Sequence, residues 1–149
     1  MTNSAPILMT WAGIWTANHI LRDIALMPWD KVPSKDDTLN STLPAANPPY
    51  ACFRVIPGKK QTNSSTRYVQ SYKVELKIFV SESSPDLQDI ADEAGRAYDV
   101  DASDLTEFTC LLVQPSDDAF EVAPEEYQGV VLQTTTLRWL IVAQQQRGT

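Results

Sequence analysis

The chain has 149 residues, a formal net charge of -7, two cysteines and one histidine. A chain of this length fits one domain that buries about two-thirds of the surface exposed on unfolding, so it needs no disulfide or metal to fold. No stretch approaches the roughly 18 apolar residues of a membrane span, and the first residues lack the pattern of a signal peptide. We therefore expect one soluble, unexported domain over residues 1–149 that has no contact with a membrane.

The charge is unevenly distributed along the chain. Residues 1–80 hold nine Lys/Arg and five Asp/Glu, residues 81–126 hold one arginine and fourteen acidic residues, and residues 127–149 hold two arginines. Because neutralising phosphates requires clustered Lys and Arg, stable binding of duplex DNA is not expected. The acidic block over 82–126 fits either a solvated surface or one face of a subunit that meets different partners on opposite sides.

The first element is predicted to be an amphipathic helix over residues 10–27. Apolar residues recur there at helical spacing, Thr10 suits the N-cap, and Pro28 follows the end. The next segment, residues 30–49, contains four prolines and has no periodicity. It predicts a long, extended proline-rich linker.

Two strands and a second helix follow the linker. The run "YACFRVIPG" predicts a strand that stops at Pro57 and Gly58, and "GKKQTNSST" over residues 58–66 predicts a long polar loop. In the next strand apolar residues alternate with polar ones, which places its buried face on the even-numbered residues and a solvated face on the odd-numbered residues. These even residues are Tyr72, Val74, Leu76, Ile78 and Val80.

The second helix follows Ser84, which suits a cap, and Pro85, which suits the first helical position. Its apolar stripe should lie across the even face of the preceding strand. The stripe comprises Leu87, Ile90, Ala91, Ala94 and Ala97 or Tyr98.

The remaining segments predict strands at "FTCLLVQ" from Phe108, at "AFEVA", and over residues 129–144, with a bulge or bend near Thr135 where the alternation shifts. Residues 50–144 should thus form the sheet and helix core. Segregated strands and helices favour the α+β class, with an antiparallel sheet and helices packed on one face.

Residue types that carry chemistry are sparse. His19 has no nearby Cys or Ser partner in the sequence, so we expect a structural role within the first helix. The motif "DVDASD" fails as a calcium loop, because Asp104 occupies the position of the required Gly and Cys110 that of the bidentate Glu. Neither GxGxxG nor GxxxxGK occurs. We expect no catalytic residue, metal or cofactor, and a protein that is not an enzyme; Cys52 and Cys110 are expected to be plain buried thiols.

The order of elements resembles a known family. A leading helix precedes a hairpin at "GKKQTNSST", the strand "SYKVELKIFV", the helix "SPDLQDIADEAGRAYD" and a final strand "LQTTTLRWLIVAQ". This arrangement is similar to that of the tail terminator (tail completion) proteins of long-tailed bacteriophages and, more loosely, to tail tube and head-tail joining proteins. The V-x-L-x-I-F strand and the D-x-x-D helix carry the resemblance, which covers roughly residues 10–144.

The resemblance implies a structural virion protein without catalytic residues. Such proteins form a ring, usually a hexamer, that caps the finished tail tube, ends its elongation and joins tail to head at the neck. The implied partners are further copies of the chain, the tail tube protein and a head-tail connector protein, with DNA passing through the lumen unbound. The implied location is the virion, and the host cytoplasm during assembly. Alternatives are a head-tail connector or tube subunit and, from another class, an acidic DNA-mimic inhibitor.

The candidate contact with a partner is the polar loop at Lys59, Lys60 and Gln61, with Arg67 at its base. A short turn would connect the two strands, so the extra length suggests a contact with the tail tube or with the acidic block of a neighbouring subunit. A hairpin tip without any partner is the alternative.

Overall fold

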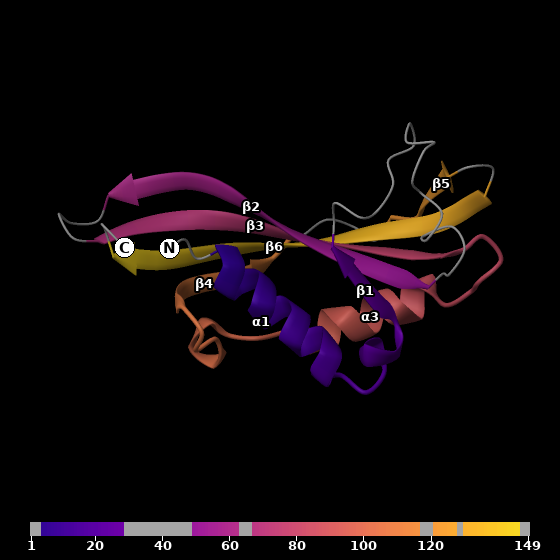
Figure 1. Cartoon of the computed structure of the whole chain (residues 1–149), viewed down its shortest axis with the longest axis horizontal. Helices are drawn as coiled ribbons and strands as arrows, with labels where there is room; N and C mark the ends of the chain where they lie inside the picture. The colour runs from indigo at the N-terminus through magenta and orange to yellow at the C-terminus, as the bar shows by residue number, and fades with distance from the viewer. Residues whose placement is uncertain (1–3, 29–48, 63–66, 117–120, 128–129, 147–149) are drawn as a thin grey trace.

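A computed structural model describes residues 4–28, 49–62, 67–116, 121–127 and 130–146. It is an α+β fold with a mixed six-stranded sheet (Figure 1). In chain order the elements are α1 (Ser4–Ala17), the 3₁₀ turn η1 (Leu21–Asp23), β1 (Ala25–Pro28), β2 (Tyr50–Thr62), β3 (Arg67–Ser81), α3 (Leu87–Ala97), the 3₁₀ turn η3 (Ala102–Asp104), β4 (Thr109–Pro115), β5 (Ala123–Tyr127) and β6 (Val130–Gln146).

The strand order is β1-β2-β3-β6-β4, and β5 also pairs with β6, at the other end of the edge that β4 occupies. All pairs are antiparallel except β1 with β2, where Ala25 lies opposite Tyr50. The expected purely antiparallel sheet is therefore wrong at this one pair. The short parallel strand comes from residues that the sequence pattern assigned to the end of the first helix.

The first helix is displaced toward the N-terminus relative to the prediction. Thr10 lies inside α1, where its hydroxyl donates a hydrogen bond to the Pro6 carbonyl (2.7 Å). The helix ends at Ala17 because the Asn18 side-chain oxygen accepts hydrogen bonds from the backbone N–H groups of Ile20 (2.9 Å) and Leu21 (3.0 Å). The predicted linker over 30–49 lies, except for Pro49, outside the described residues.

The predicted packing face of β3 is confirmed. The even-numbered side chains from Tyr72 to Val80 are each at most 1% exposed, and α1 and α3 both lie on this side of the sheet (Figure 1). From α1 the residues Ile7, Trp11 and Trp15 point into this core. The predicted stripe of α3 is confirmed as well, because Leu87, Ile90, Ala91 and Ala94 are buried.

Tyr98, just after α3, links both helices to the sheet. Its ring stacks on Trp11 of α1 (centroids 5.6 Å apart) and lies 5.0 Å from Trp139 of β6. Its hydroxyl donates a hydrogen bond to the Trp11 carbonyl (2.6 Å), and burial raises the pKa of this phenol. Aromatic packing and one buried hydrogen bond thus fix the helix layer on the sheet.

The predicted long loop after Gly58 is mostly strand. β2 runs through Pro57 and Gly58 to Thr62, with a register shift between Pro57 and Lys60. A Cβ at Gly58 would lie 2.3 Å from the Ser71 Oγ, so glycine allows the two strands to approach closely here. We call the ends of β2, β3 and β6 over residues 57–62, 67–72 and 141–146 the arm; it extends past α1 (Figure 1).

The predicted bulge near Thr135 is wrong. β3 and β6 pair without a register shift from Arg67 opposite Gln146 to Ser81 opposite Leu132. The alternation shifts because both faces are covered here: Thr135 (3% exposed) faces the helices, whereas Thr134 (2%) donates a hydrogen bond to the Ala123 carbonyl of β5. β5 itself begins where the predicted strand "AFEVA" ends.

Candidate interaction surfaces

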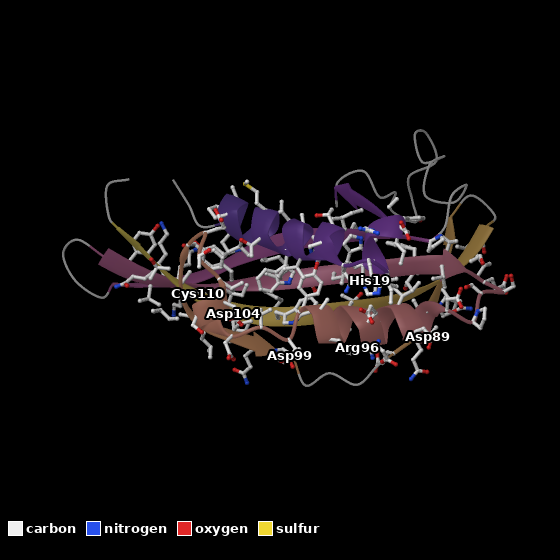
Figure 2. All side chains as sticks on the ribbon, turned by 90° about the horizontal axis from the view of Figure 1, so that it is seen from below. His19, Asp89, Arg96, Asp99, Asp104 and Cys110 are labelled. Carbon is white, nitrogen blue, oxygen red and sulfur yellow. The ribbon has the colours of Figure 1, made fainter. Side chains whose placement is uncertain are left out.

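The predicted position of His19 within the first helix is wrong. His19 is exposed and lies in the turn between α1 and η1 (Figure 2). Among the described residues, no three His, Cys, Asp or Glu side chains are grouped so that they could hold a metal ion. No described helix has both the length and the apolar character to cross a membrane.

The open face of the sheet, opposite the helices, carries an ionic row across its three central strands. Glu75 of β3 accepts hydrogen bonds from Arg54 of β2 (2.6 Å) and Arg138 of β6 (2.7 Å), and its side chain is only 6% exposed. Burial alone would raise the pKa of Glu75, but the two arginine hydrogen bonds outweigh it and lower that pKa. The row ties three strands together.

The odd-numbered face of β3 is not solvated throughout, contrary to the sequence prediction. Phe79 is fully buried against Tyr50 of β2, with ring centroids 4.7 Å apart, and Leu132 of β6 is also fully buried. Beside them Lys77 forms an ion pair with Glu125 of β5 (2.8 Å). A second, smaller apolar cluster therefore lies on the open face at the β5 end.

The two cysteines differ in environment. Cys52 of β2 is fully buried next to this second cluster, as predicted, and burial raises its pKa to about 12 even though Lys77 and Arg54 act against the shift. Cys110 of β4 is only partly buried; its thiol donates to the Leu112 carbonyl (3.4 Å), and burial raises its pKa as well. Both thiols are free.

The sheet has two open edges on opposite sides. β1 pairs only with residues 50–53 of β2, so residues 54–62 of β2 have no partner strand on their outer side within the described chain. β4 pairs with β6 alone, which leaves the outer side of Thr109–Pro115 without a described partner. Apolar side chains are exposed at both edges, with Ile56 at 37% on β2 and Leu112 at 41% on β4.

The acidic residues gather on the helix layer. Nine acidic residues and one arginine occur between Glu82 and Glu107, and all nine are exposed or partly exposed. Asp89 and Arg96 on α3, with Asp99 and Asp104 beyond it, lie along one side of the molecule (Figure 2). The open face of the sheet, in contrast, carries the lysines and arginines of the central strands. Sequence alone gave the acidic block but not the face that it occupies.

The predicted contact residues lie on the arm, in strands and not in a loop. Lys59 and Lys60 are exposed in β2, and the Lys60 ammonium lies 4.9 Å from the centroid of the Tyr68 ring. Gln61 pairs with Val69, and Arg67 is the first residue of β3, so the structure brings the backbones of all four to one end of the sheet. Nothing is described for the side chains of Gln61 and Arg67.

Two comparisons with known proteins identify no relative of the chain. No protein-family model matches the chain. A search of curated proteins also finds no significant match. The function is therefore inferred from the structure itself, namely from the two open edges, the acidic helix layer and the basic arm.

Proposed function

We propose that the protein is a structural virion subunit that forms a ring, caps the tail tube of a long-tailed bacteriophage and joins the tail to the head. The single observation that carries this proposal is the pair of open strand edges on opposite sides of one sheet. An unpaired edge presents N–H and C=O groups that a second chain can bind. Because the two edges differ, each copy would use one edge to bind the next, and such head-to-tail contacts close into a ring when the rotation between neighbouring copies is a whole fraction of a turn.

Each edge is interrupted, which limits how far pairing can extend. Pro57 and the adjacent register shift leave a short regular stretch of β2 at residues 54–56. In β4 the shift between Cys110 and Leu112 leaves residues 112–114 before Pro115. Proline and bulges at edges prevent open-ended strand addition, so a short, defined contact is favoured over aggregation. A ring of limited size is consistent with this design, and six copies is the number implied by the resemblance.

The separation of charge supports two different neighbours. A ring places equivalent faces of all its copies together, so the acidic helix layer and the open face of the sheet, which carries the lysines and arginines of the central strands, would present surfaces of different charge to different partners. Those partners would be the tail tube protein and a head-tail connector protein. A connector or tube subunit would show the same features and differ only in its neighbours.

The test is the oligomeric state of the purified protein by multi-angle light scattering and negative-stain microscopy. Rings are expected for the wild type. Leu112→Lys and Ile56→Lys, at the two edges, should reduce the ring fraction, because lysine at an edge opposes strand pairing. Leu140→Lys is the matched control, because Leu140 is as exposed as Leu112 (41% each) but lies in β6, an inner strand. A monomer at all concentrations would overturn the proposal.

A second function is favoured by one observation. The acidic residues of α3 and η3 form a surface on which Arg96 is the only described base between residues 82 and 107, as expected for a protein that imitates DNA phosphates. In that case a monomer would compete with DNA for a DNA-binding protein, and the competition would weaken with added salt. A wild-type ring without such competition would exclude mimicry.

A further inference from the structure

An open groove of about 480 Å³ runs between α3 and the turn that contains η1. Its floor is apolar: Ile24 and Ile90 are each 8% exposed, and Ile20 is 47% exposed. Its rim is almost entirely acidic. The charged residues of the rim are Asp86, Asp89, Asp92, Glu93 and Arg96.

The charge of this rim is only partly compensated. Glu93 accepts hydrogen bonds from the Asn18 side-chain amide (2.9 Å) and from Arg96 (2.6 Å), which lower its pKa. Asp86 and Asp89 have no ion pair with any other residue that the structure describes. The groove therefore favours an occupant with cationic groups around an apolar or aromatic centre.

The arm has this chemistry. Lys59 and Lys60 are exposed, and the ammonium of Lys60 lies over the Tyr68 ring, so an aromatic ring and two cations lie together at one end of the sheet. Neither lysine has an ion pair with a described carboxylate. The arm thus offers positive charge and aromatic surface where the groove offers negative charge and apolar surface.

The arm of one copy cannot reach its own groove. The arm forms one end of the long axis, whereas α3 lies toward the other end, under the opposite half of the sheet (Figure 1). The side chains of Asp89 and Arg96 are accordingly far from that end (Figure 2). A contact between these two surfaces must therefore join two different copies, and it is head-to-tail because the two surfaces differ.

We propose that the groove between α3 and η1 binds the basic arm of a neighbouring copy. This inference rests on the proposed ring, because the contact requires a second subunit in a repeating orientation. The arm–groove contact would then supplement the short edge pairing, and its charge complementarity would fix the order of subunits around the ring.

The experiment reverses the charge on each side separately. The arm variant is Lys59→Glu with Lys60→Glu, and the groove variant is Asp89→Lys with Asp92→Lys. Each should lower the ring fraction by about tenfold under conditions where half of the wild type is assembled, because like charges then face each other. Exposed substitutions of this kind should leave the melting temperature of the monomer nearly unchanged, which thermal melting checks.

Mixing the two variants identifies the occupant of the groove. In the mixture the wild-type arm meets the wild-type groove, and the Glu arm meets the Lys groove, so every second contact is wild-type and the others are charge-swapped. Rings should therefore reappear. Glu82→Lys with Glu107→Lys is the matched control, because it makes the same change in charge outside the groove and should leave rings intact.

The outcomes separate this inference from the ring proposal. Wild-type rings with unaffected arm and groove variants would overturn the arm–groove contact and leave the ring standing. Loss of rings in both variants without recovery on mixing would also overturn it, because the arm and the groove would then contact different parts of the neighbouring copy. A wild type that never assembles would overturn both proposals together.

Discussion

Strand β3 contributes side chains to both faces of the sheet, and the two faces differ in the interactions that stabilise their buried side chains. The even-numbered face is mostly apolar and is sealed by α1 and α3, so its side chains gain stability mainly from burial. The odd-numbered face holds charges that are buried only because they bind each other, as Glu75 does with Arg54 and Arg138. The even-numbered face thus stabilises the fold by apolar burial, whereas the odd-numbered face does so by ion pairs in its middle and by a second apolar cluster at the β5 end.

The largest expected effect comes from breaking the sealed face. Leu76 is fully buried among apolar residues, and Leu76→Asp places a charge there without a partner. The loss of several kcal/mol is comparable with a total stability of about 5 to 15 kcal/mol, so the variant should not fold. Lys73→Asp, on the open face of the same strand, is the control and should change the urea midpoint little. A soluble Leu76→Asp protein with native melting would contradict this assignment of faces.

The ionic row should produce an intermediate effect. Glu75→Gln removes the carboxylate charge that binds both guanidinium groups. We expect the free energy of unfolding to fall by about 2 kcal/mol, and not by more, because both arginines are partly exposed to solvent. The folded pKa of Glu75 is lowered, so its stabilisation is present above the unfolded pKa of about 4.3 and is lost as pH falls through the folded value.

The pH dependence separates charge from packing at this row. Urea unfolding of wild type and Glu75→Gln should differ most near neutral pH, and the two free energies of unfolding should converge as the solution is acidified below about pH 4. Arg54→Met with Arg138→Met tests the reverse case, in which a buried carboxylate remains without its partners. A constant difference between wild type and Glu75→Gln at every pH would contradict a role for the charge of Glu75.

A smaller effect is expected at the joint between the helix layer and the sheet. Tyr98→Phe keeps the ring contacts with Trp11 and Trp139 but removes the hydrogen bond to the Trp11 carbonyl. A loss of about 1 kcal/mol is expected for one buried neutral hydrogen bond. Thermal melting measures it, and unchanged melting would show that Tyr98 acts through its ring alone.

The sealed face could be predicted from sequence because local patterns determine it. Alternation along β3 and helical spacing along α3 each place apolar residues on one side, and burying both surfaces leaves one arrangement. The end of α1 could not be predicted in the same way. Helical spacing continues past Ala17, and only the hydrogen bonds of the Asn18 side chain with Ile20 and Leu21 end the helix.

The candidate surfaces were less accessible to prediction because they depend on long-range pairing. Pro57 and Gly58 normally end a strand, but an open edge tolerates proline, and the glycine fits closely against Ser71. The groove joins residues of α3 to Ile20 and Ile24, which are remote in sequence. Lys59 and Lys60 were identified from sequence, whereas the position of Lys60 on a strand, opposite Gln70, required the register.

The smallest expected effect is a difference in reactivity between the two thiols, of which one lies on the open face of the sheet and the other at the β4 edge. Cys52 is fully buried on the open face with its pKa raised to about 12, so almost no reactive thiolate exists at neutral pH. Cys110 is only partly buried in the edge strand β4, so a thiol reagent should modify it first and with little loss of stability. Single Cys52→Ala and Cys110→Ala variants assign the two kinetic phases. Faster reaction at Cys52 would mean that the second apolar cluster beside it opens more readily than the β4 edge. The open face would then be the less stable of the two faces even where its side chains are buried.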